Sequence, residues 1–452
     1  MSEINTETFK VKQGLTPEIV KEISVEKGDP EWMLDFRLKC LKLYDEMPVP
    51  DWGPSLEGLD MDNIVTYVRP KGKMAHSWDD VPEDIKDTFE KLGIPEAERK
   101  SLAGVGAQYD SELVYHNIKA QVAAEGVIYS DMKSALHGPY ANMIKEKFMK
   151  LVPPETHKFL ALHGAVWSGG SFVYVPPGVK VDIPLQSYFR LNEPGAGQFE
   201  HSIIIVDEGA ELNFVEGCSA PLYNEASLHS GCVELYVEKN AKLRHSGIEN
   251  WSKNMYNMNT LRVHVAEGGT MEWISGSFGS KVTFIYPMTI LDGEGAKMEY
   301  TGITFAGKGQ DLDTGMKVIH NAPNTTSSVN TRSISKDGGR STTRTEVYVA
   351  KEAENAKCTV GCTSLMLDDI SRSDTIPAID VRTNSADVGH EAKIGRISDE
   401  AVFYLMSRGI NEDEARTMLV SGFADSVSKE LPLEYAAEMN NLIRLEMKDG
   451  IG

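Results

Sequence analysis

A repeat of about 30 residues in the second half of the chain constrains the fold more than any other feature. From Phe172 onward, a turn-like pair of residues is followed each time by a run in which apolar and polar residues alternate. The second residue of the pair falls at Val179, Ala210, Ala241, Gly269, Ala296, Thr326, Ala356 and Ala386. A coil of this length buries its apolar face only by stacking on its neighbours. The spacing therefore predicts a parallel β-helix of at least eight rungs.

The residues around each mark support this interpretation. The pairs begin with Gly, Asn, Thr or Ser, which suit tight turns, and the residue two positions after the mark is mostly apolar. Cys358 has the inward position that Leu212 and Met298 share, so we expect it to pack in the core. A β-sandwich or a propeller with regular spacing is the competing interpretation, although propeller blades usually need longer repeats.

Helical patterns flank the repeat. In the N-terminal part, one helix is expected after Pro30 and another near residues 132–151; after the repeat, Ser398 and Asn411 are expected to cap two helices, and a third runs from about Pro432. We expect the C-terminal helices to close the open end of the solenoid. The predicted division is an N-terminal mainly helical domain (1–150), a β-helix core (151–396) and a C-terminal helical domain (397–452).

The charge of the chain limits its partners. It has 46 basic and 67 acidic residues, a formal net charge of -21. Such a surface repels a phosphate backbone, so nucleic acid is not an expected partner. The first residues show no basic region followed by an apolar stretch, and nowhere do 18 apolar residues follow one another. We expect a cytoplasmic protein without a membrane segment.

The five cysteines, at positions 40, 218, 232, 358 and 362, form an odd set without zinc-finger spacing, which favours reduced thiols over a disulfide framework. Cys362 falls one rung before His390 and Glu391 at a similar offset, which predicts that the three lie within roughly 10 Å. A thiolate, an imidazole and a carboxylate suit iron or zinc, and equally a reactive thiol. The alternative is that Cys362 is a small core residue and His390 caps the last strand.

Cys218 is the second candidate. Gly217 and Pro221 flank it, which favours a strand end or loop with an accessible thiol. It lies five rungs from Cys362, or roughly 24 Å, so the two thiols cannot share one metal. If both are functional, one receives something that the other uses. Cys232 is expected in the core, and Cys40 has no predicted function.

Three further residues, Arg190, Asn192 and Trp251, either line a path along the solenoid or are ordinary solvated and packing side chains. The chain has no Gly-x-x-x-x-Gly-Lys-Ser/Thr loop for phosphate and no nucleophile elbow. We therefore do not expect it to hydrolyse ATP by itself.

The order and spacing of several segments resemble the SufB branch of the SufB/SufD family, part of the SUF machinery for iron-sulfur cluster assembly. No segment is specific alone, and the match runs over most of the chain. The segments are PEWMLDFR (30–37), VPPGV (175–179), EGCSAP (216–221), DTGMKVIH (313–320), NSA (384–386), HEA (390–392), RI (396–397) and ELPLEY (430–435).

The resemblance implies a right-handed parallel β-helix between helical domains and a scaffold on which an iron-sulfur cluster is built. By this match Cys218 accepts persulfide sulfur, and Arg190, Asn192 and Trp251 belong to the sulfur path. Cys362 is the cysteine where the cluster forms, with Glu391 and then His390 as further ligands. Two residues depart from those that some relatives carry. Gly389 stands where some relatives have another acid, which concerns a second ligand of the cluster. Glu249 stands where some have an amide-type residue, which concerns the sulfur path.

The resemblance also implies partners. These are the ATPase SufC, docked on residues 398–448, then SufD or a second copy of this chain, a cysteine desulfurase or sulfur shuttle, and apo-protein acceptors. The cluster is transient cargo of uncertain type, and reduced flavin carried by the complex is a further expected cofactor.

Two alternatives remain open on the sequence. A SufD-like structural subunit would have the same solenoid without a cluster site, which Cys218, Cys362 and Glu391 together argue against. A carbohydrate-binding or lyase-type β-helix would use Asp311 and Asp313 as acids on one solenoid face, and the reduced thiols argue against it.

Overall fold

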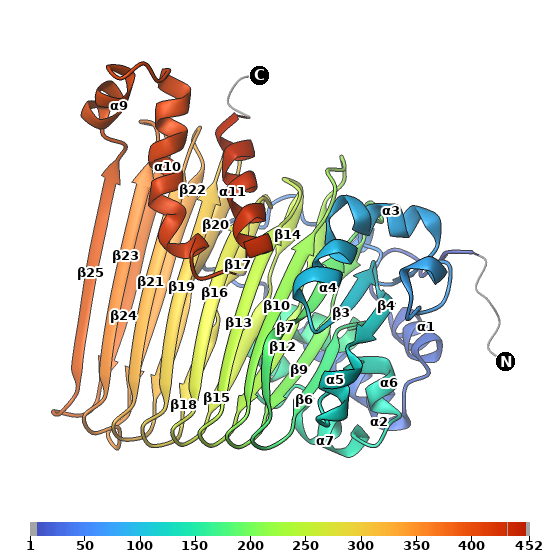
Figure 1. Ribbon diagram of the computed structural model, residues 1–452. Helices are drawn as coiled ribbons and strands as arrows, with labels where there is room; N and C mark the ends of the chain where they lie inside the picture. The colour runs from blue at the N-terminus through green and yellow to red at the C-terminus, as the bar shows by residue number, and fades with distance from the viewer. Residues whose placement is uncertain (1–6, 432, 449–452) are drawn as a thin grey trace.

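A parallel β-solenoid forms the body of the molecule, with helical segments at its N- and C-terminal ends (Figure 1). The structure is a computed structural model that describes residues 7–431 and 433–448. The first six residues, on which the absence of an export signal was argued, and Pro432, the expected start of the last helix, lie outside the described residues. The prediction of a mainly β solenoid is confirmed, and the domain boundaries stay a prediction.

The helices of the N-terminal part are short and separated by strands. They are α1 (Pro17–Lys27), α2 (Glu31–Glu46), α3 (Glu83–Lys91), α4 (Ile94–Ser101), α5 (Ala120–Ala124), α6 (Met132–Leu136), α7 (Ala141–Lys147) and α8 (Lys158–Val166), with single turns η1 (Met61–Asn63), η2 (Trp78–Asp80) and η3 (Pro154–Thr156). The C-terminal helices are α9 (Asp399–Met406), α10 (Glu412–Ser428) and α11 (Leu433–Lys448).

The strands form two long sheets and a small pair. The first sheet, of ten strands, contains β3 (Gly104–Tyr109), β4 (Glu112–Ile118), β7 (Lys180–Arg190), β10 (Glu211–Ser219), β13 (Lys242–Asn250), β16 (Thr270–Phe278), β19 (Lys297–Ala306), β21 (Thr326–Ser335), β23 (Lys357–Met366) and β25 (Asp387–Arg396). The small pair is β1 (Phe9–Lys10) with β2 (Val68–Arg69).

The second sheet faces the first across the solenoid interior. It contains β5 (Ile128–Asp131), β6 (Ser171–Val175), β8 (Gly197–Gln198), β9 (His201–Val206), β11 (Ser227–His229), β12 (Cys232–Val237), β14 (Met255–Asn257), β15 (Thr260–Val265), β17 (Val282–Ile285), β18 (Met288–Leu291), β20 (Asp311–His320), β22 (Arg340–Val349) and β24 (Arg372–Val381). In the last coils, the single long strands β20, β22 and β24 replace the pairs of short strands found earlier.

A left-handed residue turns the chain before seven strands of the first sheet, from β7 to β23. Gly178, Gly209, Gly268 and Gly295 have φ between 63° and 72°, and asparagine takes the same role at positions 240, 324 and 355. Glycine and asparagine tolerate this conformation better than other residues. These are the predicted turn residues except at the sixth mark, and the last predicted turn residue, Ser385, does not take the left-handed conformation.

The exception is the sixth mark, where the predicted register is wrong by one residue. Thr326 pairs with Lys297, so Thr325 and not Thr326 corresponds to Ala296, and Asn324 makes the turn. Several consecutive polar residues in this coil are compatible with a turn, so the sequence pattern does not show which of them turns. A one-residue shift exchanges the two faces of a strand. Ser327 is accordingly the residue that faces inward here.

Constant register stacks equivalent residues into columns inside the solenoid. One column is largely apolar and buried, and it confirms the core position predicted for Cys358. Its members are Val181, Leu212, Leu243, Met271, Met298, Ser327, Cys358 and Val388.

The N-terminal segments cover the first coils, with β3 pairing parallel to β7. A buried arginine of α2 joins them to the solenoid: Arg37 Nε lies 2.6 Å from Asp29 Oδ2, and Arg37 Nη1 donates to the carbonyl oxygen of Trp167 at 3.0 Å. The single helix predicted over 132–151 is wrong. The chain forms α6 and α7 instead, because Gly138 and Pro139 interrupt the pattern.

The C-terminal helices begin at the predicted caps, with Ser398 Oγ accepting from Ala401 N and Asn411 Oδ1 from Glu414 N. They do not close the open end of the solenoid as predicted. Helices α10 and α11 lie along the outer face of the first sheet (Figure 1), where residues such as Val420 and Met439 pack on outward-facing Ile274. The last rung, β24 and β25, therefore stays uncovered in the described chain.

No helix among the described residues combines the length and apolar character needed to cross a membrane.

Replacing Arg37 tests how the N-terminal segments are attached to the solenoid. Arg37→Ala leaves the Asp29 carboxylate, 2% exposed, without its cation, and such a loss costs about 3–5 kcal/mol. Lys39→Ala on the same helix is the control, because its pair with Glu155 is exposed and contributes less than about 1 kcal/mol. Urea unfolding followed by tryptophan fluorescence measures both changes. Equal effects of the two substitutions would contradict this account.

Candidate functional site

Cys218 lies near the end of β10 with its side chain directed into the solenoid. Its thiol is 2% exposed, so the expectation of an accessible thiol is wrong. Gly217 and Pro221 do mark a strand end, since β10 stops at Ser219, but the strand is an internal one. Burial, with the charges of nearby glutamates, raises the pKa of this thiol well above its usual value.

A buried polar network that sequence reasoning missed surrounds this thiol. His229 Nε2 lies 2.5 Å from Glu200 Oε1, and His229 Nδ1 lies 2.7 Å from Asn257 Oδ1. Asn257 Nδ2 in turn donates to Glu249 Oε2 at 2.7 Å. The one available signal was register, since His229 and Asn257 occupy the same position in successive coils.

Burial and charge act in opposite directions within this network. Burial lowers the pKa of the His229 imidazole, but the charge and hydrogen bond of Glu200 outweigh it and raise that pKa to about 9. Burial raises the pKa of the Glu249 carboxyl to about 7. A cavity of about 30 Å³ lies beside Cys218, between Glu216, His245 and Glu249, which is room for a single water or ion.

Cys362 and His390 meet at the last two rungs. Cys362 Sγ lies 3.8 Å from His390 Nε2, and the thiol is 2% exposed. Glu391 does not join them: it pairs in register with Gly361, so its side chain points to the opposite face of β25. That side chain is 70% exposed and lies 2.9 Å from Lys393 Nζ.

Small and polar residues occupy the columns between the two cysteines. The column of Cys218 continues through Glu249, Ser277, Thr304, Ser333 and Ser364, all buried. The neighbouring column runs from Glu216 through Gly247, Ser275, Gly302 and Thr331 to Cys362. Five rungs separate the two thiols, as predicted, and a hydroxyl-rich band of the interior connects them.

The three predicted path residues occupy different places. Trp251 is buried, and its ring centroid lies 4.6 Å from that of His229, which joins it to the network at Cys218. Arg190 pairs in register with Ser219 and donates to Ser219 Oγ at 3.0 Å, which places it on the face of the sheet opposite to Cys218. Asn192 follows β7, and its backbone N–H donates to Asp110 Oδ1. The structure thus brings only Trp251 to the thiol.

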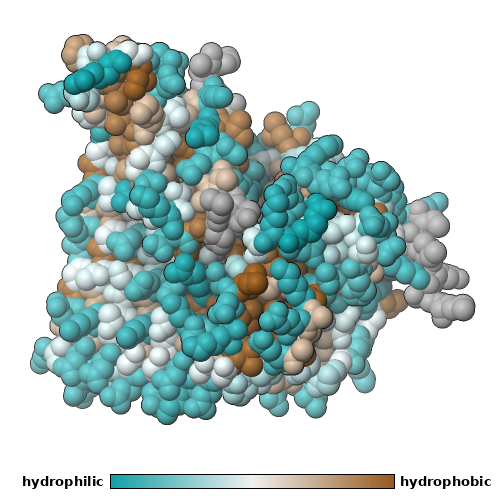
Figure 2. Space-filling model, in the orientation of Figure 1, coloured by the Kyte–Doolittle hydropathy of each residue, from teal (hydrophilic) through white to brown (hydrophobic). Residues whose placement is uncertain are grey.

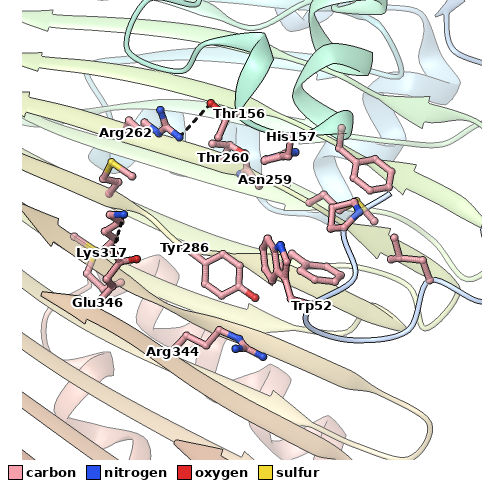
Figure 3. Close-up of a pocket in the computed structure, with 17 residues that line it drawn as sticks. Trp52, Thr156, His157, Asn259, Thr260, Arg262, Tyr286, Lys317, Arg344 and Glu346 are labelled. Atoms are coloured by element: carbon pink, nitrogen blue, oxygen red, sulfur yellow. Dashed lines mark hydrogen bonds and ion pairs between the residues drawn. The ribbon is translucent and has the colours of Figure 1, made fainter. Parts of the chain in front are cut away.

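A larger cavity, of about 410 Å³, lies on the outer face of the second sheet, where Trp52 and Tyr286 face it (Figure 3). Its three cations already have oxygen partners. Arg262 donates to the carbonyl of Leu151, Lys317 pairs with Glu346, and Arg344 pairs with Asp313. None of the predicted site residues lines this cavity.

Comparison with known proteins identifies the family of the chain. A family model described as "SUF system FeS cluster assembly, SufBD core domain" matches residues 189–423. Iron-sulfur cluster assembly SufBD family proteins of Staphylococcus haemolyticus, Staphylococcus epidermidis and Staphylococcus aureus are each 52% identical over 444 residues, covering 98% of this chain and 95% of the relative. The chain belongs to the SufBD family.

As a SufBD protein, the chain is a component of the SUF iron-sulfur cluster assembly system. The matched core runs from β7 into α10 and contains both candidate cysteines. The lyase alternative loses its support, because Asp313 is 1% exposed and held by Arg344, while Asp311 lies 3.7 Å from Arg340.

Burial of Cys218 predicts slow chemical modification of the folded SufBD protein. We expect iodoacetamide near neutral pH to alkylate Cys218 at least about tenfold more slowly than in concentrated urea, because reagent and thiolate are both scarce at a buried, protonated thiol. Peptide mass spectrometry of timed samples measures the rates, and buried Cys40 serves as a second protected thiol. Equal rates for Cys218 in both states would show that the thiol is open.

Proposed function

We propose that this chain is the SufB-type scaffold subunit of its assembly system, which accepts sulfur at Cys218 and builds a cluster at Cys362. The observation that carries the proposal is that both thiols point into the same solenoid interior and are linked by columns of small polar residues. A SufD-like structural subunit needs no such arrangement.

Sulfur acceptance at Cys218 is proposed as a thiol-disulfide type of exchange. The Cys218 thiolate attacks the outer sulfur of a donor persulfide, so a new S–S bond forms at Cys218 and the donor leaves as a thiolate. The thiol must first lose its proton and become accessible. The exposed loop that follows β10, with Leu222 70% exposed, is the surface nearest in sequence where a cysteine desulfurase or sulfur shuttle could approach.

Transfer toward Cys362 would follow the hydroxyl-rich band. Hydroxyls both donate and accept hydrogen bonds, so they can solvate a polar sulfur species in the absence of bulk water. Two contacts line this band: Ser333 Oγ lies 2.8 Å from Ser364 Oγ on the next rung of the same sheet, and Thr304 Oγ1 lies 2.9 Å from Thr314 Oγ1 of the facing sheet. Trp251 fits a role at the start of this band, whereas Arg190 lies on the opposite face of the sheet and Asn192 beyond the end of β7.

Cluster assembly is proposed at the Cys362 and His390 pair. Thiolate sulfur and imidazole nitrogen are ligands that iron accepts. Glu391 becomes a ligand only if β25 rearranges or if the site is completed by a partner, because its side chain faces away from Cys362. The cluster is cargo for apo-protein acceptors, and the flavin expected from the resemblance stays a prediction.

The uncovered last rung supports pairing with a second solenoid, either SufD or another copy of this chain. Strands β24 and β25 each have ten residues, and within the described chain each has a neighbour on one side. Ile376, Ile379, Val381 and Ile394 are 39–48% exposed there. A long apolar edge of this kind is a template for pairing with another chain.

The C-terminal helices support docking of an ATPase, for which the chain itself has no phosphate loop. Phe403, Tyr404 and Met406 of α9 and Met418 of α10 are exposed. Figure 2 shows hydrophobic residues gathered at the tip where α9 lies beside α10. Contiguous exposed apolar residues mark interaction sites. Movement of two docked ATPases would then open the paired solenoids and expose Cys362.

Anaerobic reconstitution with iron and sulfide, in the presence of the ATPase partner, tests the cluster site. We expect Cys362→Ser to abolish the cluster and His390→Ala to weaken it, because the two side chains form the only thiol–imidazole pair on the last two described rungs. Glu391→Ala is the control on the opposite face. Visible absorbance and iron content are the measurements.

Each outcome discriminates between subunit types. Full cluster in Cys362→Ser would remove the scaffold assignment and favour the SufD-like structural subunit. Loss of the cluster in Glu391→Ala would show that the assembled site differs from that of the single chain.

Filling the polar band tests the sulfur path. Ser333→Ile places a larger apolar side chain in the column between the cysteines, and we expect persulfide to form at Cys218 while sulfur at Cys362 falls several-fold. Overpacking costs about 1–3 kcal/mol, so circular dichroism should confirm the fold. The control is Asn330→Ile, on the outer face of the same strand. Unchanged delivery in Ser333→Ile would place the path elsewhere.

A further inference from the structure

The network at Cys218 contains a set of metal-ligand atoms. One ligand atom each from Glu200, Cys218 and His229 lie within 4.8 Å of one another, and all three residues are buried. Glu200 comes from the segment between β8 and β9, Cys218 from β10 and His229 from β11. Three chain segments of the solenoid thus converge on one point of its interior.

The hydrogen bond between His229 Nδ1 and Asn257 orients the imidazole ring, so that its other nitrogen faces the group of ligand atoms. Glu249 Oε2 accepts a hydrogen bond from Asn257 Nδ2, so Asn257 Oδ1 faces His229 and accepts a hydrogen bond from its Nδ1–H. The ring therefore presents Nε2 to Glu200. A histidine that binds a metal is commonly held in this way, with its other nitrogen donating to an outer oxygen.

One oxygen of the Glu200 carboxylate lacks a partner. Glu200 is 0% exposed, and its Oε2 has no hydrogen-bond partner among the described residues. A buried carboxylate oxygen left unpaired is costly. Gly231 lets the ligand atoms approach the backbone closely, because a Cβ at this position would lie 2.4 Å from Glu200 Oε1 and 3.0 Å from His229 Nε2.

A second cluster of similar composition shows the contrast. His163, His201 and Cys232 also place ligand atoms within 4.8 Å of one another. Their ring nitrogens, however, all have partners: His163 contacts the Ser230 carbonyl and His201, and His201 contacts Glu234. Glu234 further accepts three backbone N–H groups. This cluster is internally satisfied and needs no ion.

We propose that Glu200, Cys218 and His229 form a binding site for one thiophilic divalent cation, of the class of Zn²⁺ or Fe²⁺. One thiolate, one imidazole and one carboxylate match the ligands of such ions and leave a fourth position open. The ion would balance the negative charges of the Glu200 carboxylate and of the thiolate that forms when Cys218 binds it. Binding releases the proton of the Cys218 thiol and the proton between His229 Nε2 and Glu200.

The site lies five rungs from Cys362 and is separate from the proposed cluster site. Metal binding itself does not depend on the proposed function. One consequence does rest on it: a cation on Cys218 and a persulfide on Cys218 exclude each other, since both use the same sulfur.

Titration of the full-length Cys362→Ser protein with Co²⁺ and then Zn²⁺, under anaerobic reducing conditions, tests the proposal. We expect one Co²⁺ per chain with a sulfur-to-cobalt charge-transfer band, which Zn²⁺ displaces. The Cys362→Ser background removes the proposed cluster site, so failure of that proposal leaves this readout unaffected.

Variants assign the ligands. Glu200→Gln keeps the size of the side chain and should abolish the band or weaken binding at least about tenfold, as should His229→Ala; Asn257→Ala should weaken binding about 10–100-fold through lost orientation. Cys232→Ser, in the satisfied cluster, is the matched control and should bind normally. Circular dichroism confirms the fold. Absence of binding to the parent protein, an unchanged band in Glu200→Gln and His229→Ala, or its loss in Cys232→Ser would each overturn the proposal.

Discussion

Stacking of parallel coils in constant register is the constraint on which the rest of this SufBD protein depends. A single coil has too little apolar surface to stay folded alone, so each strand from β7 to β25 is stabilised by its neighbours. Register also means that one position in the coil becomes one column through the molecule. The residue types at one coil position therefore decide whether that column of the interior is apolar or polar. Register alone makes neighbours of residues that are far apart in the sequence.

The columns divide the interior into an apolar part and a polar part. The column of Leu212 and Cys358 packs as an ordinary core, whereas the columns of Cys218 and Cys362 contain glutamates, serines, threonines and glycines. A solenoid made only for stability would fill these positions with aliphatic side chains. Buried carboxylates such as Glu249, with a pKa raised to about 7, instead mark this region as a candidate for function. Both Cys218 and Cys362 are buried there.

Several features could be predicted from the sequence because they depend on local or periodic information. Turn residues at about 30-residue intervals predict the solenoid, and Ser398 and Asn411 predict helix starts, since caps act within one turn. The same local signals gave a wrong prediction where two local structures were equally compatible with the sequence. At Thr326 the run of polar residues allowed a one-residue slip, and at Gly138 a break was overlooked between two short helices.

The chain's own pattern was enough to indicate the coil length and the number of rungs between Cys218 and Cys362, because period and register follow from residue spacing. Other features required the folded molecule. Glu200, His229 and Asn257 gather around Cys218 because strands of the second sheet face the first. The repeat spacing predicts neighbours within one sheet and does not predict which residues of the other sheet lie opposite them. The opposite facing of Glu391 and Cys362 and the packing of α10 and α11 along the sheet were likewise decided by three-dimensional packing, in which side-chain direction and the burial of outer apolar columns outweigh nearness in sequence.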